Sequence, residues 1–300
     1  MKILAAVVTH NRRELLGRCI DQLLKQVRAP DELLIINNSS TDGTEKMLLA
    51  RGVPYITQEN TGSAGGWRRG IEHAIEQNFD AVWLMDDDGF PDTGALAILE
   101  KALTPGVACA SSIILREDRP THFVFPIPLL DKSGQPVIFG APRKIDTLEK
   151  LHRLAPDGIY PFAHLFNGAL ISAEAARAIG NVNQNYFISG DEVDYFCRLR
   201  KGGRVVSLLD AIQFHPDVSK RPFTPVKFYY YLKNTLILNE RYFDAVPLRN
   251  LLAVAAVLGR TAKRNGPVVA LSYLFGRNAP VFYQAIIRGL RGQIGKDFDG

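Results

Sequence analysis

The chain has 300 residues, of which 46% are hydrophobic and 22% are charged, so it is long enough for a large globular domain and too apolar for a disordered chain. Its three cysteines lie far apart and form no CxxC pair, which argues against a disulfide framework or a zinc knuckle. The net charge of +5 is concentrated after residue 219, where there are 13 Lys and Arg side chains and only 4 Asp and Glu side chains.

The first 115 residues alternate short apolar runs with segments in which apolar residues recur at helical spacing. We expect strands at residues 3–8, 32–38, 53–58, 81–86 and 107–115, and helices at residues 12–27, 41–52, 63–78 and 93–103. Strands that alternate with helices predict right-handed crossovers and a mainly parallel sheet with flanking helices. The fold class is therefore α/β and Rossmann-like.

Prolines and glycines interrupt this pattern from about residue 116 to residue 165, where we expect an irregular insertion with a hairpin near residues 131–139. The remaining elements are expected as a strand and a helix within 166–180, a helix at 188–203, a strand at 204–211, and helices at 224–243, 246–264 and 266–292. These elements divide the chain into an α/β domain of residues 1–219 and a basic, aromatic-rich helical region of residues 220–300. The first apolar run is too short for a signal peptide, and no run reaches the ~20 apolar residues that span a bilayer, so we expect a cytoplasmic protein.

Polar side chains follow each of the first four strands. Thr9 and Asn11 follow the first strand, Asn38 the second, Asn60 the third, and three consecutive aspartates close the fourth. Ligands of open α/β sheets bind beyond the carboxyl ends of the strands. The sequence therefore predicts a site for a large polar ligand at this edge of the sheet.

The aspartates at the end of the fourth strand, in "VWLMDDDGFPD", form an Asp-x-Asp arrangement. Oxygen ligands of this kind suit Mg²⁺ or Mn²⁺, and a divalent ion would remove the repulsion between Asp86 and Asp88. A polar turn is the simplest alternative. The pattern also fits the hydrophobic-DxDG motif of haloacid-dehalogenase-type phosphatases, but their nucleophilic Asp follows the first strand, whereas Asp86 follows the fourth.

Three further stretches carry candidate site residues. "NTGSAGGWRRG" opens a helix whose backbone N–H groups would attract phosphate, or it is a glycine-rich turn with solvated arginines. Asp191 and Glu192 begin the helix in "SGDEVDYFCR", where one of them would serve as a general base. The alternative is local helix stability, with Ser189 and Glu192 as a capping box and Asp194 and Arg198 as an ion pair. His215 follows the last strand of the α/β domain, as a metal ligand or a structural residue.

The motifs "VVTHNR", "IINNSSTDGT", "NTGSAGGWRRG", "VWLMDDDGFPD" and "FISGDEVDYFCRLRKGG", in this order, resemble inverting family 2 glycosyltransferases, which have the glycosyltransferase A fold. The triple-Asp form most resembles bacterial galactofuranosyltransferases, and rhamnosyltransferases are the next most similar. The resemblance covers about residues 1–216. It implies transfer of a sugar from a nucleotide donor with the help of a divalent metal.

The resemblance also implies a role for each matching residue. The metal ligands would be Asp86, Asp88 and His215, and the base would be Glu192, with Asp191 as the alternative. The nucleotide-sugar would contact Thr9, Asn11, Arg12, Asn38, Gly65, Trp67, Arg68 and Asp87. Asn167 and Gly168 would line the acceptor side. Asn38 stands where many relatives carry an Asp that contacts the uracil, which leaves the base of the nucleotide open.

We therefore expect a glycosyltransferase that moves galactofuranose from UDP-galactofuranose onto a glycan or polyprenyl-diphosphate-linked acceptor in bacterial surface polysaccharide synthesis. The alternatives are a rhamnosyltransferase that uses dTDP-rhamnose and a catalytically silent glycan- or lipid-binding module. The C-terminal region would contact the inner face of the plasma membrane as a peripheral anchor, complete the domain, or form a homo-oligomer interface. We expect no nucleic-acid partner.

Overall fold

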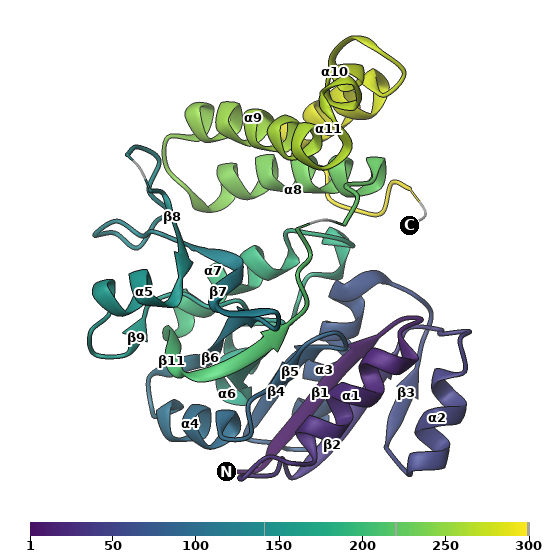
Figure 1. Cartoon of the computed structure of the whole chain (residues 1–300), viewed down its shortest axis with the longest axis vertical. Helices are drawn as coiled ribbons and strands as arrows, with labels where there is room; N and C mark the ends of the chain where they lie inside the picture. The colour runs from purple at the N-terminus through teal and green to yellow at the C-terminus, as the bar shows by residue number, and fades with distance from the viewer. Residues whose placement is uncertain (141, 220, 299–300) are drawn as a thin grey trace. The chain divides into compact units, whose positions relative to one another are not determined.

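The computed structural model describes residues 1–140, 142–219 and 221–298 (Figure 1). The chain forms two compact units. The sheet unit contains Met1–Val182 and Tyr195–Asp217, and the helical unit contains Asn183–Asp194 and Val218–Gly300. The short segment of residues 183–194, which the sequence analysis assigns to the α/β domain, therefore belongs with the C-terminal helices.

The described residues form the following elements. The strands are β1 (Ile3–Thr9), β2 (Glu32–Asn37), β3 (Tyr55–Thr57), β4 (Ala81–Asp86), β5 (Phe90–Pro91), β6 (Val107–Arg116), β7 (Arg119–Pro128), β8 (Lys144–Thr147), β9 (Ile159–Tyr160), β10 (Asn167–Ser172) and β11 (Arg204–His215). The helices are α1 (Arg13–Leu23), α2 (Thr44–Arg51), α3 (Gly62–Glu76), α4 (Ala95–Ala102), α5 (Leu148–Leu154), α6 (Ala173–Ile179), the 3₁₀ helix η1 (Gln184–Tyr186), α7 (Asp191–Gly202), α8 (Pro225–Tyr242), α9 (Val246–Asn265), α10 (Pro267–Phe275) and α11 (Ala279–Leu290).

The central sheet has the strand order β3-β2-β1-β4-β10-β6-β11-β5. Strands β3, β2, β1, β4, β6 and β11 run in one direction, and β10 is inserted antiparallel between β4 and β6. The α/β class with a mostly parallel central sheet is thus confirmed. In the register of the sheet Thr9 lies beside Asn37, and Val8 lies beside Asp86. The carboxyl ends of β1, β2 and β4 consequently meet at one edge, as the sequence predicts.

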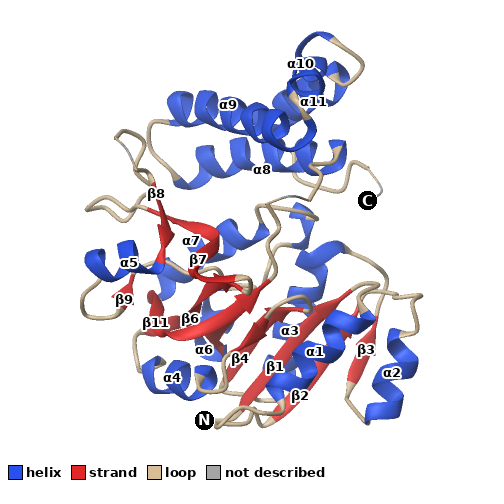
Figure 2. Cartoon of the chain, in the orientation of Figure 1, coloured by secondary structure: helices blue, strands red, loops and turns tan. Residues whose placement is uncertain are grey.

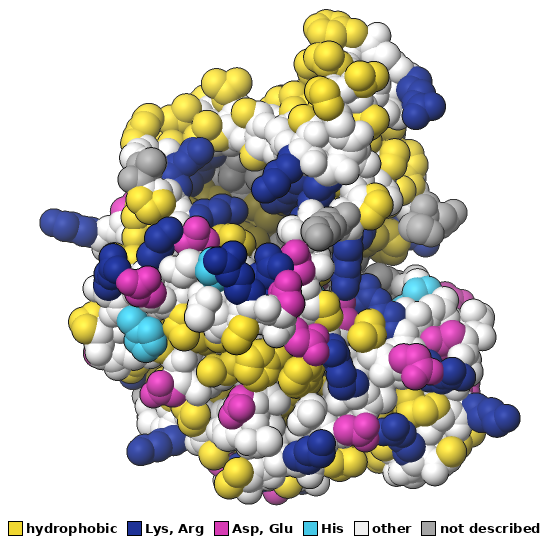
Figure 3. Space-filling model, in the orientation of Figure 1, with side chains coloured by type: hydrophobic (Ala, Val, Ile, Leu, Met, Phe, Trp, Pro, Cys, Tyr) yellow, Lys and Arg dark blue, Asp and Glu magenta, His cyan; other side chains and the backbone are white. Residues whose placement is uncertain are grey.

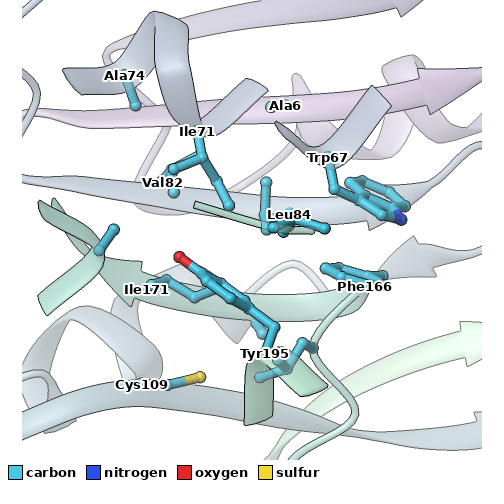
Figure 4. Close-up of a cluster of buried hydrophobic side chains, with 14 of the residues drawn as sticks. Ala6, Trp67, Ile71, Ala74, Val82, Leu84, Cys109, Phe166, Ile171 and Tyr195 are labelled. Carbon is cyan, nitrogen blue, oxygen red and sulfur yellow. The ribbon is translucent and has the colours of Figure 1, made fainter. Parts of the chain in front are cut away.

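Helices cover both faces of this sheet (Figure 2). The side chains of β1 alternate between the two faces and are buried on each, as expected for a strand between two helical layers. Ile3, Ala5 and Val7 pack in a cluster with α1 and α4, whereas Leu4 and Val8 pack in a second cluster with α3, α6 and α7. Figure 4 shows this second cluster, in which Trp67 and Ile71 of α3 lie over β4.

Helix α3 packs very close to β1. A Cβ atom at Gly66 would collide with the Val8 side chain, and one at Gly70 would lie 3.1 Å from the Ala6 Cβ atom. Only glycine at Gly66 permits this approach without a shift of backbone or side chains. The glycine-rich stretch that the sequence analysis offers for phosphate binding therefore also serves helix packing.

The segment expected to be irregular contains regular elements. Strand β7 forms an antiparallel pair with β6, β8 pairs with β7, and α5 follows directly. Near the predicted hairpin, Leu130 and Pro136 form a single bridge around the turn in which Gly134 N donates to the Asp131 carbonyl oxygen at 2.9 Å. Pro120, Pro126 and Pro128 lie within β7 itself, whereas Gly134 lies in the turn, so the prolines of this segment do not exclude regular structure.

The last predicted helix, at residues 266–292, is wrong because it is two helices, α10 and α11. Gly276 ends α10, and Pro280 lies in the first turn of α11, where its missing N–H group is not needed. Among the helices formed by residues 1–140, 142–219 and 221–298, none combines the length and apolar character that spanning a bilayer requires.

Candidate functional site

The three consecutive aspartates after β4 are held by the loop that follows β1. Asp87 and Asp88 are only 3% and 2% exposed. The Thr9 hydroxyl donates to Asp87 Oδ2 at 2.7 Å, and Arg12 Nη1 donates to Asp87 Oδ1 at 3.0 Å and to Asp88 Oδ2 at 2.9 Å. One guanidinium therefore bridges two buried carboxylates. Burial raises the pKa of the Asp87 carboxyl, and the Arg12 charge opposes that rise.

His215, the last residue of β11, contacts the same cluster. Its Nε2 atom lies 2.9 Å from Asp88 Oδ1, and its Nδ1 atom lies 2.8 Å from the Pro216 carbonyl oxygen. Because a carbonyl oxygen only accepts hydrogen bonds, Nδ1 carries a proton, and Nε2 is the nitrogen that a metal would use. A histidine that ligates a metal usually donates its other N–H group in this way.

Asp86 is bound from the neighbouring antiparallel strand. Asn167, the first residue of β10, donates from Nδ2 to Asp86 Oδ2 at 3.2 Å. The next residue, Gly168, has φ +90°, and a Cβ atom there would lie 3.0 Å from Gln213 Oε1 and 3.2 Å from Ser112 Oγ. Asn167, which the sequence analysis assigns to the acceptor side, thus holds one of the expected metal ligands in this structure.

Gln213 of β11 is a polar residue of this site that the sequence analysis missed. It is fully buried, and both of its amide atoms lack a hydrogen-bond partner within the part of the chain that the structure describes, as do Asn167 Oδ1 and Ser112 Oγ. The sequence does show a glutamine two residues before His215, in an otherwise apolar strand end. Because a buried amide needs a hydrogen-bond partner, this glutamine could have been recognised as a candidate site residue.

The chemistry of this cluster fits a divalent ion, although its geometry is not that of a formed metal site. Across residues 1–140, 142–219 and 221–298, no group of three or more His, Cys, Asp or Glu side chains is arranged to hold a metal. Of the three expected ligands, Asp88 and His215 meet, whereas Asp86 is turned toward Asn167. Two carboxylates and one imidazole nitrogen are ligands that Mn²⁺ accepts. Arg12 supplies positive charge at the cluster in its present arrangement.

The substitution Arg12→Met is therefore expected to destabilise the metal-free protein and to do so less when Mn²⁺ is present. It leaves two buried carboxylates without their shared cation, which should cost about 2 kcal/mol, between the values for exposed and buried pairs because the Arg12 side chain is 42% exposed. Thermal unfolding in EDTA and in MnCl₂ measures the difference. Equal destabilisation in both buffers would contradict the idea that Arg12 and a metal compensate the same charges.

Asn11 and Asn38, which the sequence analysis places at the nucleotide, both shape the loops at this edge. Asn11 has φ +52°, and its Oδ1 accepts from Thr41 N at 2.7 Å. Asn38 is buried; its Oδ1 accepts from Gln58 Nε2 at 2.8 Å, and its Nδ2 donates to the Gly62 carbonyl oxygen at 3.3 Å. Asn38 thereby joins the end of β2 to the start of α3.

The residues predicted on α3 lie in three different environments. Trp67 is 1% exposed and stacks on Phe166 with ring centroids 4.7 Å apart, so in this structure it packs in the core (Figure 4). Arg68 pairs with Glu72 through an Nε–Oε1 contact of 2.8 Å. A Cβ atom at Gly65 would collide with the Thr61 side chain. The sequence alone does not show whether a tryptophan in a glycine-rich stretch is buried in the core or exposed to a ligand.

The two acidic residues that begin α7 differ strongly in environment. Asp191 is 4% exposed, and its Oδ2 has no hydrogen-bond partner among the described residues. Burial, followed by the charge of Glu192, raises the pKa of Asp191 to about 7. Glu192 is partly exposed. Asp191 thus has the proton affinity of a general base that works near neutral pH.

Comparison with known proteins places this chain among sugar transferases. Residues 5–151 match glycosyl transferase family 2. The chain is 35% identical over 220 residues to galactofuranosyltransferase GlfT1 of Mycolicibacterium smegmatis, a match that covers 71% of this chain and 70% of the relative. It is 36% identical over 232 residues to galactofuranosyltransferase GlfT1 of Mycobacterium tuberculosis, covering 75% of this chain and 73% of that protein.

Solved structures share the fold at low sequence identity. The mannosyltransferase PcManGT from Pyrobaculum calidifontis, in complex with GDP-Man and Mn²⁺, is 16% identical, with a TM-score of 0.55 over 96% of this chain and 85% of that one. TarS residues 1–349 from S. aureus are 13% identical, with a TM-score of 0.54 over 97% of this chain and 81% of that one.

Proposed function

Because the chain belongs to glycosyltransferase family 2, we propose that it transfers galactofuranose from UDP-galactofuranose to a glycan or to a glycan carried on polyprenyl diphosphate. The chain is a glycosyltransferase with the glycosyltransferase A fold. The name of its relatives supports the choice of sugar. The observation that carries the proposal is the buried aspartate cluster with His215, because a nucleotide-sugar needs a site that balances the charge of its diphosphate.

The donor would bind at the carboxyl edge of the sheet. Asp86, Asp88 and His215 would hold Mn²⁺ or Mg²⁺, and this ion, when bound, supplies positive charge that stabilises the departing diphosphate. Thr9, Asn11, Arg12, Asn38 and Asp87 would surround the nucleotide, with Gly65 and Arg68 beside the diphosphate. Thr9 and Arg12 already fix the orientation of Asp87, which keeps the aspartate turn in place before the donor arrives.

The reaction would be a single displacement with inversion at C1 of the sugar. Asp191 accepts the proton of an acceptor hydroxyl, whose oxygen forms the new bond to C1 as the bond from C1 to the diphosphate oxygen breaks. Of the two acidic residues that begin α7, Asp191 is supported by its burial and its raised pKa of about 7. We therefore propose Asp191, rather than Glu192, as the base. Asn167 and Gly168 would border the acceptor.

The choice of donor is tested by incubating the purified protein and Mn²⁺ with UDP-galactofuranose and, separately, with dTDP-rhamnose, and measuring release of the nucleoside diphosphate. We expect release from UDP-galactofuranose. Faster release from dTDP-rhamnose would favour the rhamnosyltransferase. Nucleotide binding without release from either donor, with a range of glycan acceptors, would favour a silent glycan- or lipid-binding module.

We also propose that the helical unit attaches the protein to an anionic membrane surface at the inner face of the plasma membrane. Val268, Leu271 and Phe275 are 78%, 57% and 86% exposed and follow one another at helical spacing along α10. Hydrophobic side chains gather in this upper part of the helical unit in Figure 3. Lys263 and Arg264 lie in the last turn of α9, and Arg277 follows α10. Apolar side chains flanked by cations suit acidic lipid headgroups.

Replacing all three apolar residues of α10 by serine is expected to abolish flotation with vesicles that contain acidic phospholipid. These side chains are exposed, so the substitutions should leave folding intact. Leu154→Ser, at an exposed leucine of the sheet unit, is the matched control and should float like the unchanged protein. Equal flotation of the α10 variant would exclude this helix as the anchor.

A further inference from the structure

The segment that leads into α7 has an unusual backbone. Phe187 and Ser189 have φ values of +61° and +65°, and Gly190 has φ +99°. The left-handed region costs a residue other than glycine about 1–2 kcal/mol, so surrounding contacts must hold this conformation. The segment ends directly before Asp191, so its backbone conformation determines the position of the proposed base.

One side chain of α8 supports most of this segment. Asn234 is 1% exposed, and its Nδ2 lies 3.1 Å from the Tyr186 carbonyl oxygen, 3.2 Å from that of Ile188 and 2.6 Å from that of Ser189. A Cβ atom at Gly190 would lie 3.0 Å from Asn234 Cβ. The Asn234 amide thus contacts three backbone carbonyl groups immediately before Asp191. Gly190, which has no side chain, allows the backbone of this segment to pass close to α8.

A second contact from α8 holds the first turn of α7. Asp194 is 1% exposed, and its Oδ1 accepts from the Tyr242 hydroxyl at 2.7 Å and lies 3.4 Å from Arg241 Nη1. The Tyr186 hydroxyl also lies 3.3 Å from Asp194 Oδ1. Asp194 is three residues after Asp191, so the two residues occupy one turn of the helix. Contacts from α8 therefore hold the chain on both sides of Asp191.

We propose that Asn234 and Tyr242 are positioning residues that fix Asp191 for proton transfer, so that the C-terminal helical unit takes part in catalysis by supporting the base. This inference rests on the proposed function of Asp191. A general base must lie within hydrogen-bond reach of its proton, and displacement by about 1 Å costs about 10²-fold in rate. Loss of the Asn234 amide leaves three carbonyls without their shared donor and frees a strained backbone to relax.

Asn234→Ala tests this role in the full-length protein, with UDP-galactofuranose and a glycan acceptor. We expect kcat to fall by about 10- to 10²-fold, while the KM for the donor and Mn²⁺-dependent UDP binding stay within about twofold of the unchanged protein. Asn239→Ala is the matched control: it lies on the same helix, is also buried, and bonds to Asn250 Oδ1 at 2.9 Å instead of to the segment before α7. The control should retain the kcat of the unchanged protein.

The double variant Asn234→Ala/Asp191→Asn separates positioning from general loss of structure. If Asn234 acts through Asp191, adding Asn234→Ala to Asp191→Asn should lower the residual kcat by less than about twofold. Multiplicative losses would overturn the proposal. Full turnover by Asp191→Asn would instead show that the proposed base is wrong, and no turnover by the unchanged protein would show that the donor is wrong.

Tyr242→Phe is a second variant for the case that Asn234→Ala does not fold. It removes only the hydroxyl that donates to Asp194, and we expect a several-fold loss of kcat at an unchanged donor KM. Tyr283→Phe, which removes a half-exposed hydroxyl of α11 that donates to the Leu274 carbonyl oxygen at 3.3 Å, is its control. Equal kcat values for these two tyrosine variants would overturn the role of Tyr242.

Discussion

Asp191→Asn is expected to lower kcat by about 10²- to 10⁴-fold, the range for loss of a general base, while donor binding remains intact. The asparagine keeps the shape of the side chain but cannot accept a proton from the acceptor hydroxyl. Steady-state kinetics give kcat, and titration with UDP in the presence of Mn²⁺ measures binding. Glu192→Gln is the neighbouring control and is expected to lose much less activity, because Glu192 is only partly buried. The opposite ranking of the two variants would assign the base to Glu192.

The pH dependence of the reaction provides an independent check on Asp191. Its carboxyl group has a pKa of about 7, so the fraction that can accept a proton falls as the pH is lowered below neutrality. In the unchanged protein kcat/KM should therefore decline about tenfold for each pH unit well below 7. The residual activity of Asp191→Asn should not show this decline at acidic pH, the acid limb of the pH profile. An acid limb of the same shape in the variant would place the titrating group elsewhere.

The same carboxyl group should make the protein less stable as the pH rises. The unfolded chain releases this proton near the ordinary value of 3.8, whereas the folded chain releases it near 7. Between these values the folded state binds more protons, so the free energy of unfolding falls as the pH rises, by about 4 kcal/mol in total. Asp191→Asn should consequently be more stable than the unchanged protein at pH 8 and similar to it at pH 4. Chemical unfolding at both pH values measures this difference.

The sequence predicted the parts of the fold that depend on local patterns. The apolar run of β1 and the helical spacing of α1 are both readable from neighbouring residues. The antiparallel insertion of β10 between β4 and β6 was not readable, since strand neighbours are chosen by contacts across the whole sheet. The break between α10 and α11 did have a local signal in Gly276 and Pro280, which the apolar periodicity on either side obscured.

The candidate site was predictable in composition but not in its contacts. The aspartates and Thr9 come together because they follow the neighbouring strands β4 and β1, a relation that the order of strands and helices implies. His215 lies near them because β5, directly after the aspartates, pairs with the end of β11, and the sequence did not show that pairing. The sequence did not distinguish buried Trp67 from an exposed aromatic residue, or Asp191 from Glu192, because burial depends on packing. Asn234 was visible as a polar residue within the apolar helix "FYYYLKNTLIL", a position that calls for a buried hydrogen bond.

The second large effect is expected for Asp88→Asn, which should lower sugar transfer at least ~10³-fold, as several kcal/mol of charge stabilisation would be lost with the metal. One carboxylate oxygen of Asp88 meets His215, the other meets Arg12, and its backbone carbonyl accepts from Arg18 Nη2 at 3.2 Å. The asparagine fits the same space but loses the negative charge that a divalent ion requires. Calorimetric titration with MnCl₂ should therefore show weakened binding alongside the lost activity.

The control for Asp88→Asn is Asp92→Asn, in the same acidic stretch. Asp92 is exposed, and its Oδ1 accepts from Gly94 N at 3.2 Å just before α4. Asparagine keeps this acceptor oxygen, so the substitution should preserve the turn and leave transfer unchanged. Adding EDTA to the unchanged protein should reproduce the defect of Asp88→Asn, and excess Mn²⁺ should reverse the effect of EDTA but not that of the substitution. Transfer by Asp88→Asn at the normal rate in EDTA would exclude a metal held by this aspartate. It would then leave Arg12 as the charge that balances the diphosphate, because Arg12 is the cation that already bridges Asp87 and Asp88.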